Sequence, residues 1–258
     1  MNAELDAALG VAQAAGEVLR DGFGLRRQVR YKGEVDLVTE MDERAEGIIR
    51  EALLGAYPSY GMLAEEGGAL PGEENARWIV DPLDGTTNYA HGLPVFAVSI
   101  ALEKAGEVVL GVVHDPMREE TFVAERGQGA RLNGESTSVS ETDELIQALV
   151  VTGFPYDRDD VPAALDLFGR FSMLVQGMRR LGSAALDLCY VASGRLDAYY
   201  ERGIQAWDVA AGNLILEESG GRITDYRGEP FELEVGELVA SNGRLHPALV
   251  ELTSEHLG

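Results

Sequence analysis

Two aspartates three residues apart, Asp81 and Asp84, stand in a segment whose groups could hold a metal ion beside a phosphate. The segment reads Asp81-Pro-Leu-Asp-Gly-Thr-Thr-Asn88 and follows four residues that are typical of a short buried strand. Pro82 disfavours helix at Asp81 and cannot donate a backbone hydrogen bond, so the chain is expected to turn here. The two carboxylates and the Leu83 carbonyl between them form the all-oxygen set that hard cations such as Mg²⁺ prefer.

The second half of this segment could receive the phosphate. Residues 85–88 can open a helix, and the free N–H groups and positive dipole end of a helix suit an anion. The alternative is an ordinary Asx-type turn after a strand, since Asp, Gly and Asn all favour turns. One pair of aspartates alone favours the turn, so the choice depends on motifs elsewhere in the chain.

Further motifs that contain acidic residues occur along the chain. In order they are Asp36-Leu-Val-Thr39-Glu-Met-Asp42, Ala64-Glu65-Glu66-Gly67, the segment above, Arg180-Leu-Gly182-Ser183-Ala184-Ala185, Asp197-Ala-Tyr199-Tyr200-Glu201, Trp207-Asp208-Val209-Ala210-Ala211-Gly212 and Glu218-Ser-Gly220-Gly221. Together they resemble the inositol monophosphatase family of Mg²⁺-dependent, lithium-sensitive sugar phosphatases, in its bacterial form. The resemblance runs from roughly Leu5 to Leu252 and implies a layered αβαβα sandwich, whereas the pattern alone indicates only mixed α/β structure.

The resemblance implies a role for individual residues. The metal ligands it implies are Glu65, Asp81 and the Leu83 carbonyl for one ion, and Asp81, Asp84 and Asp208 for a second. The phosphate ligands are the backbone N–H groups of Gly85 and Thr86, and the catalytic residues that orient or activate water are Asp42, Thr86 and Glu65. The sugar contacts are Asp84, Ala184, Glu201 and Asp208. The implied cofactor is two or three Mg²⁺ ions, for which Mn²⁺ could substitute.

Elementary chemistry also favours carboxylates as the working groups. Hydrolysis of a phosphate monoester needs an activated water and neutralised charge, which two metal ions can supply. The four histidines have no zinc-ligand spacing, and the absence of a Gly-Lys dipeptide excludes a P-loop. Local alternatives stay open: Glu65 as a solvated surface residue, Asp208 as a helix cap and Asp42 as a partner of a helix dipole. Asp36 is interpreted as supporting the site, and Lys32 lies one residue nearer to it than in the family.

Composition bounds the class of protein. The chain has 258 residues, 45% of them hydrophobic, and no apolar run of about 18 residues that could span a membrane. Its start, residues 1–4, lacks the basic and apolar segments of an export signal, so a cytoplasmic location is predicted. Cys189, the single cysteine, is expected in the core. The net charge of −23 disfavours nucleic acid as a partner, and adaptation to a salty cytoplasm could also explain it.

The pattern of expected elements changes at about residue 141, and the resemblance implies two halves that share one core. Residues 1–140 should form an α+β half that carries most metal ligands, and residues 141–258 an α/β half that carries Asp208 and the sugar contacts. In the first half we expect a helix over 5–23, a loop over 26–34, a helix after a capping box at 39–42, and strands at 62–64, 78–80, 95–102, 108–114 and 121–123. In the second half we expect helices at 161–176, 183–193 and 209–218, and strands at 148–151, 198–201 and 222–225.

The resemblance implies hydrolysis of inositol 1-phosphate, or of a similar small polyol phosphate, by a homodimeric enzyme. Related enzymes act on fructose 1,6-bisphosphate, histidinol phosphate, NADP or 3′-phosphoadenosine phosphates, and these substrates stay open. A haloacid-dehalogenase-type phosphatase is disfavoured, since its Asp-x-Asp-Gly-Thr motif is one residue shorter than the spacing here. A different alternative is a partner protein of the transcription machinery, because some bacterial relatives have that role.

Overall fold

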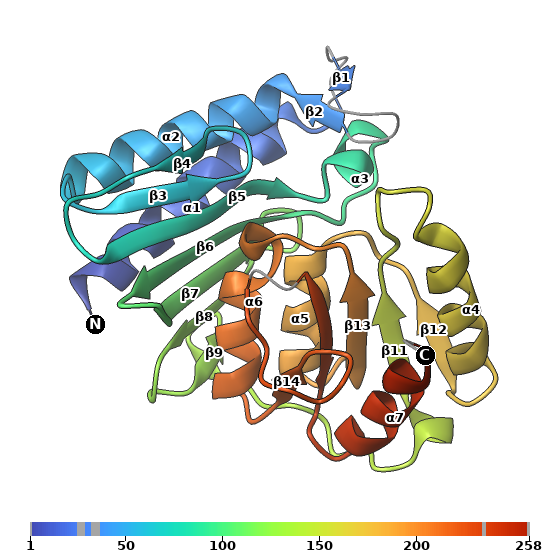
Figure 1. Ribbon diagram of the computed structural model, residues 1–258. Helices are drawn as coiled ribbons and strands as arrows, with labels where there is room; N and C mark the ends of the chain where they lie inside the picture. Colours follow the sequence, from blue (N-terminus) through green and yellow to red (C-terminus); the bar gives the residue numbers. More distant parts are fainter. Residues whose placement is uncertain (1, 25–28, 32–36, 234–235, 257–258) are drawn as a thin grey trace.

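Five layers of helices and sheets are stacked across the molecule (Figure 1). The computed structural model describes residues 2–24, 29–31, 37–233 and 236–256. The layers are, in order, helices α1 (Ala3–Gly22) and α2 (Glu40–Ala56), an eight-stranded sheet, helices α5 (Ala184–Ala192) and α6 (Ala206–Glu218), a five-stranded sheet, and helices α4 (Val161–Ser172) and α7 (His246–His256). This order confirms the αβαβα sandwich that the resemblance implied.

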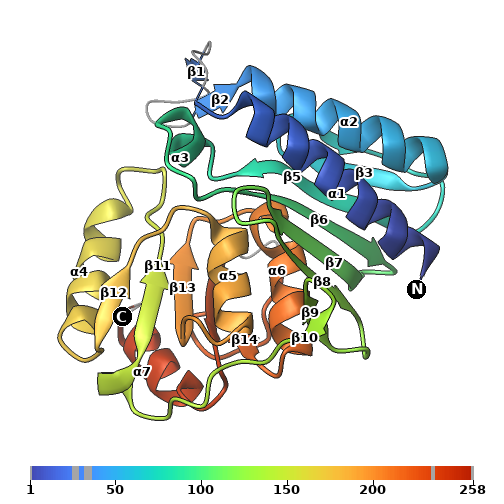
Figure 2. The same cartoon turned by 180° about the vertical axis from the view of Figure 1, so that it is seen from behind.

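The eight-stranded sheet has the strand order β10-β9-β8-β7-β6-β5-β3-β4. Its strands are β3 (Gly61–Ala64), β4 (Gly68–Leu70), β5 (Ala76–Asp84), β6 (Ala97–Lys104), β7 (Glu107–Asp115), β8 (Glu120–Glu125), β9 (Ala130–Leu132) and β10 (Glu135–Ser136). Helices α1 and α2 cover its outer face, as the view from behind shows (Figure 2). Only β3 and β5 pair in parallel, so their carboxyl ends meet at the same edge of the sheet, where ligands bind in many α/β folds.

The five-stranded sheet has the order β12-β11-β13-β15-β14. Its strands are β11 (Leu149–Thr152), β12 (Gly177–Arg179), β13 (Ala198–Arg202), β14 (Arg222–Thr224) and β15 (Glu237–Ser241). Strand β11 pairs in parallel with β12 and β13, while the other pairs are antiparallel. Three short elements lie outside both sheets: the ribbon of β1 (Val29–Tyr31) with β2 (Leu37–Thr39), helix α3 (Thr86–Ala90), and a 3₁₀ turn at Leu145–Gln147.

Helices α5 and α6 are apolar on almost every side because a sheet covers each of their two faces. Residues 185–192 of α5 are all buried, and they include Cys189, which confirms its predicted place in the core. A charged side chain on such a helix must find compensation, since burial of an unpaired charge is costly. Asp187 and Asp208 are therefore unusual residues of this layer.

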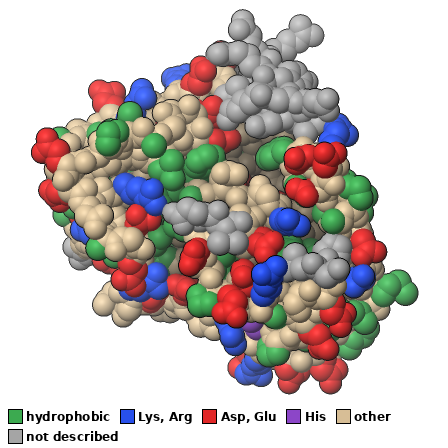
Figure 3. Space-filling model, in the orientation of Figure 1, with side chains coloured by type: hydrophobic (Ala, Val, Ile, Leu, Met, Phe, Trp, Pro, Cys, Tyr) green, Lys and Arg blue, Asp and Glu red, His purple; other side chains and the backbone are tan. Residues whose placement is uncertain are grey.

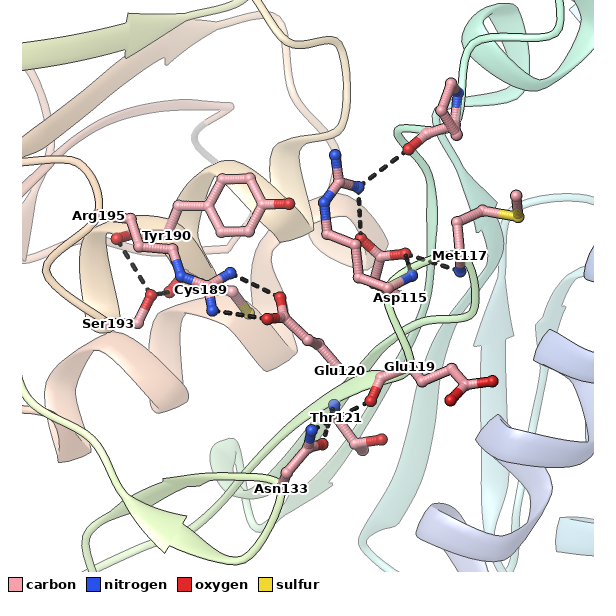
Figure 4. A network of polar contacts seen from close by, with 12 residues as sticks. Asp115, Met117, Glu119, Glu120, Thr121, Asn133, Cys189, Tyr190, Ser193 and Arg195 are labelled. Atoms are coloured by element: carbon pink, nitrogen blue, oxygen red, sulfur yellow. Dashed lines mark hydrogen bonds and ion pairs between the residues drawn. The ribbon is translucent and has the colours of Figure 1, made fainter.

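Charged contacts tie the eight-stranded sheet to the segment that follows α5 (Figure 4). Arg195 donates two hydrogen bonds to the Glu120 carboxylate, at 2.6 and 2.7 Å, and its guanidinium lies 5.3 Å from the centre of the Tyr190 ring. Nearby, the fully buried Asp115 accepts a hydrogen bond of 2.8 Å from Arg118. The pair of Arg195 and Glu120 therefore holds the segment after α5 against β8, while the bond of Asp115 and Arg118 holds the turn that follows β7.

Acidic side chains are spread over the face seen in Figure 3 and do not gather in one patch, in keeping with the net charge of −23. None of the helices in the part of the chain that the structure describes combines the length and apolar character needed to cross a membrane.

The structure moves several predicted boundaries. Strand β5 continues through Pro82 to Asp84, so the expected turn is a bulge inside the strand, between Asp81 and Asp84. Helix α6 begins at Ala206 and not at 209, and α4 ends at Ser172 and not at 176. Part of the loop expected over 26–34 is strand β1, and no element was expected at β4, β12, β15 or α7.

Candidate active site

A cavity of about 320 Å³ opens where β5, α3, α5, α6 and β13 meet. Nine of the ten residues singled out from the sequence line it: Glu65, Asp81, Leu83, Asp84, Gly85, Thr86, Ala184, Glu201 and Asp208. They come from both sides of the α5–α6 layer and from segments far apart in the chain. The fold therefore brings the predicted site residues together, except for Asp42.

Asp81 and Leu83 are placed by the bulge in β5. From Asp81 to Asp84 the strand uses one residue more than its neighbour β6, which re-aims side chains at the sheet edge. The Leu83 N–H donates a hydrogen bond of 2.9 Å to Oδ1 of Asp81. Burial raises the pKa of Asp81 well above its ordinary value, and the charges of Glu65, Asp84 and Asp208 raise it further. These carboxylates are therefore close enough to repel one another.

Asp84 joins β5 to the N-terminus of α5. Its Oδ2 accepts hydrogen bonds from the Ser183 hydroxyl at 2.5 Å and the Ala185 N–H at 2.8 Å, and its Oδ1 accepts one from the Ala184 N–H at 3.2 Å. Burial raises the pKa of Asp84 to about 6 although these bonds lower it. The Ala184 amide is thus already engaged by Asp84, through the longest of the three bonds.

Asp208 lies in the first turn of α6. Gln205 is the N-cap, and its N–H donates a hydrogen bond of 2.7 Å to Oδ2 of Asp208, as part of a capping box. The interpretation of Asp208 as the cap itself is therefore wrong by three positions, because the helix begins earlier than the hydrophobic pattern suggested. Burial, followed by the charge of Asp84, raises the pKa of Asp208 well above its usual range.

Asp42 is fully buried and reaches the cavity only through Thr86. Its Oδ2 accepts hydrogen bonds from the Thr39 N–H and hydroxyl, at 2.9 and 2.5 Å, which confirms the predicted capping box of α2. Its Oδ1 accepts a bond of 2.8 Å from the Thr86 hydroxyl, which also lies 3.0 Å from the Leu83 carbonyl. Burial raises the pKa of Asp42 against the effect of the threonine bonds.

Glu65 follows β3 and lies beside β5, where its N–H donates to the Val80 carbonyl at 3.3 Å. The loop after it is held from α2 by Glu46, a buried carboxylate. Oε2 of Glu46 accepts hydrogen bonds from the Glu66 N–H at 2.9 Å and the Gly67 N–H at 3.1 Å. The position of Glu65 therefore depends on a residue of the outer helix layer.

Glu201 lines the cavity and lies near the end of β13. The Tyr199 hydroxyl donates a hydrogen bond of 2.5 Å to its Oε2. Gly153 packs against the same carboxylate so closely that a Cβ there would collide with Oε1. Burial raises the pKa of Glu201 to about 7, opposed by the Tyr199 bond and the charge of Arg180.

The donor set of the cavity fits a hard divalent cation. Carboxylate and carbonyl oxygens face it, and the carboxylates raise one another's pKa through repulsion that a cation would relieve. Among the described residues, no three His, Cys, Asp or Glu side chains already surround one ion position. Binding of a cation would therefore draw these carboxylates closer together.

Comparisons with known proteins agree with this chemistry. The profile of the Inositol monophosphatase family matches residues 1–257. The chain belongs to the inositol monophosphatase family. It is 46% identical over 242 residues to the inositol-1-monophosphatase of Rhizobium meliloti, with 92% of this chain and 91% of the relative covered. It is 42% identical over 249 residues to the Nus factor SuhB of Pasteurella multocida, with 95% and 93% covered. The crystal structure of the extragenic suppressor protein SuhB from Bartonella henselae superposes with a TM-score of 0.95 at 40% identity, with 98% and 99% covered.

As a member of a phosphatase family, the chain is an enzyme. Its cavity also contains residues to which the sequence assigned no role. Arg180 and Asp187 line the cavity, as do Phe154 and Tyr156. Asp187 carried a signal that was overlooked, namely a single charge in an otherwise apolar helix. Glu46 gave no such signal, because its partners are about 20 residues away in the chain. Lys32 and Asp36 lie outside the described residues.

Proposed function

We propose that this protein is a divalent-metal-dependent phosphomonoesterase that hydrolyses inositol 1-phosphate or a similar small polyol phosphate. The observation that carries the proposal is the convergence of four carboxylates and the Leu83 carbonyl on one cavity beside the start of α3. The name of the Rhizobium meliloti relative, inositol-1-monophosphatase, supports the choice of substrate class.

The proposed metal ligands are those that the family resemblance implies. Glu65, Asp81 and the Leu83 carbonyl would hold one ion, and Asp81, Asp84 and Asp208 a second, with Mg²⁺ as the natural ion and Mn²⁺ as a substitute. When bound, such ions lower the pKa of water and neutralise charge that develops on phosphoryl oxygens. Asp81 is assigned to both ions, so this carboxylate should be the least replaceable of the set.

Thr86 and Asp42 form the proposed relay for the proton of the attacking water. The Thr86 hydroxyl donates its proton to Oδ1 of Asp42, which leaves its lone pairs free to accept a hydrogen bond from water. The raised pKa of Asp42 makes this carboxylate a stronger base than an exposed aspartate. The bonds from Thr39 prevent Asp42 from turning away, so the relay is fixed before substrate binds.

The backbone N–H groups of Gly85 and Thr86 are the proposed phosphate ligands. They begin α3 and therefore have no acceptor within the helix. Helix α3 has only five residues, so its dipole is small, and the direction of the N–H groups matters more than the dipole. Gly85 has φ +100°, and a Cβ there would lie 2.8 Å from the Val95 carbonyl, so the loop requires glycine at this position.

Glu201 is the residue proposed to accept hydrogen bonds from the polyol hydroxyls. The Tyr199 hydroxyl already donates to Oε2, so we assign the other oxygen of Glu201 to the substrate. The carboxylates of Asp84 and Asp208 would face the same polyol from the metal side. The Ala184 amide could join them by sharing its long bond to Asp84, which measures 3.2 Å.

The deciding experiment is a phosphate-release panel with metal-free protein. We expect turnover of inositol 1-phosphate on addition of Mg²⁺ or Mn²⁺, none in EDTA, and inhibition by lithium. The panel also contains fructose 1,6-bisphosphate, histidinol phosphate and NADP. Full turnover in EDTA would refute the metal mechanism, whereas preference for another member of the panel would refute only the substrate.

A second candidate function, as a partner of the transcription machinery, is favoured by the 42% identity to a relative named Nus factor SuhB. The net charge of −23 points to a basic protein partner and away from direct contact with RNA. The test is affinity capture with purified RNA polymerase and the Asp81→Asn variant. Capture by this variant at the level of the natural protein would separate the second function from catalysis, and no capture by either protein would refute it.

A further inference from the structure

Asp187 is a buried acid that the proposed mechanism does not use. It lies one turn into α5, whose other residues are apolar (Ala184-Ala-Leu-Asp-Leu-Cys-Tyr-Val-Ala192), and its side chain belongs to the wall of the active-site cavity. Only 1% of the residue is exposed. Its place at the wall of the cavity, in a layer that is otherwise built for packing, calls for a chemical reason.

The carboxyl group of Asp187 lacks the hydrogen bonds that its neighbours have. Its Oδ1 is buried and accepts no hydrogen bond from any described residue. By contrast, Asp84 on the same cavity accepts three. Native proteins satisfy most buried polar atoms, because leaving one without a partner destabilises the fold. An apolar residue at this position of α5 would avoid that cost.

The groups around Asp187 leave it in need of a donor. The charges that act on it are those of Glu201 and Asp84, which are repulsive, and that of Arg180, which is attractive. Tyr199 gives its only hydroxyl proton to Glu201 and so cannot serve Asp187. The missing donor must therefore come from whatever enters the cavity. A ligand with several adjacent hydroxyl groups has donors for Glu201 and for Asp187 at the same time.

We propose that Asp187 is a specificity-determining residue that accepts a hydrogen bond from a hydroxyl of the polyol, beside the hydroxyl that Glu201 binds. The two carboxylates then select substrates with neighbouring hydroxyls over phosphates that have a flat or apolar leaving group. This inference depends on the proposed function, since it concerns the sugar end of the same cavity. It gives Asp187 no part in metal binding or in the chemical step.

The test compares the Asp187→Leu and Asp187→Asn variants on inositol 1-phosphate and on an aryl phosphate, in saturating Mg²⁺. For Asp187→Leu we expect KM for inositol 1-phosphate to rise about tenfold, the equivalent of one hydrogen bond to a charged group. Its kcat and its kinetics on the aryl phosphate should not change, and its melting temperature should not fall. Asp187→Asn retains an acceptor of the same size and should show a smaller rise in KM, and it decides the test if Asp187→Leu does not fold.

Asn213 offers a matched control on the neighbouring helix. It is also buried, and its Oδ1 also lacks a partner among the described residues, but it lines a different cavity. Asn213→Leu should leave KM for both substrates unchanged. An unchanged KM in both Asp187 variants, or an equal loss on both substrates, would overturn the inference while the proposed function stands. Absence of any turnover of polyol phosphates by the natural protein would instead overturn the proposed function, and the inference with it.

Discussion

Replacement of Glu46 should weaken cation binding although Glu46 lies outside the cavity. Its carboxylate, 4% exposed, accepts two backbone hydrogen bonds from the loop that follows Glu65, at 2.9 and 3.1 Å. A Glu46→Ala change removes the one oxygen, Oε2, that accepts both bonds and leaves the N–H groups of Glu66 and Gly67 to water. The loop then has fewer restraints, and Glu65 spends less time in the position from which it would bind a cation.

The size of this effect follows from the two bonds. Hydrogen bonds to a charged group contribute about 1.5–3 kcal/mol each, so the pair restrains the loop by about 3 kcal/mol at the lower limit. If half of that energy orders Glu65, the binding-competent fraction of the loop falls about tenfold, and the apparent Kd for Mg²⁺ rises by the same factor. Glu46→Gln keeps one acceptor oxygen, so its effect should be smaller.

The assay is a Mg²⁺ titration followed both by phosphate release and by the rise in melting temperature, so that binding is observed apart from turnover. Glu51→Ala is the matched control, because Glu51 lies on the same helix but is exposed. Saturating Mg²⁺ should restore most of kcat in Glu46→Ala. Equal half-saturating Mg²⁺ concentrations for Glu46→Ala and Glu51→Ala would show that the loop does not need Glu46, and the reasoning would be refuted.

Four further outcomes are expected. Asp81→Asn should lower kcat by more than about 100-fold, which is the upper range for residues that merely support a metal ligand. Glu66→Gln should change kcat little, and comparable losses of kcat in the two variants in steady-state assays would contradict this prediction. Glu201→Gln should raise KM for polyol phosphates about tenfold and spare aryl phosphates, so a parallel loss on both would assign Glu201 a supporting role. In EDTA, the free energy of unfolding should fall as pH rises from about 4.5 to about 7, because folded Glu201, with its pKa near 7, keeps a proton that the unfolded chain has lost. Denaturant titrations in which the free energy of unfolding rises over this pH range would contradict the prediction. Light scattering should give the mass of a homodimer, and a monomer mass would refute that prediction.

Features set by neighbouring residues were predictable from the sequence. The capping box at Thr39 and Asp42 is local, since both partners lie within one turn, and it placed Asp42 correctly at the start of α2. Gly85 likewise marked the start of α3 through its position after the aspartates. Pro82 does not end strand β5, because the proline lies at a bulge, where a strand tolerates a residue without an N–H donor. The start of α6 was misplaced because the helix is apolar on most sides and gives no clear period.

Contacts between distant segments could not be predicted in the same way. The bond between Ser183 and Asp84 spans 99 residues, and nothing in either local pattern indicates it. The roles of Glu46 and Asp187 also depend on which segments the fold brings together. The family resemblance identified site residues that lie far apart in the chain, but only at positions inside the family's motifs. Residues that hold those positions in place, or that line the cavity beside them, required the structure.

The four aspartates of the site are all oriented by backbone hydrogen bonds. Each accepts a backbone hydrogen bond through one carboxylate oxygen: Asp42 from Thr39, Asp81 from Leu83, Asp84 from Ala185 and Asp208 from Gln205, at 2.9, 2.9, 2.8 and 2.7 Å. Backbone donors do not depend on side-chain identity, so the carboxylates keep their orientation in spite of mutual repulsion. In Asp42 the second oxygen accepts a hydrogen bond from the Thr86 hydroxyl. A set of like charges anchored in this manner cannot disperse to relieve repulsion. Proton uptake, which the raised pKa values of Asp81 and Asp208 favour, or the binding of cations can relieve this repulsion, so we expect metal binding to stabilise the fold as well as to support catalysis.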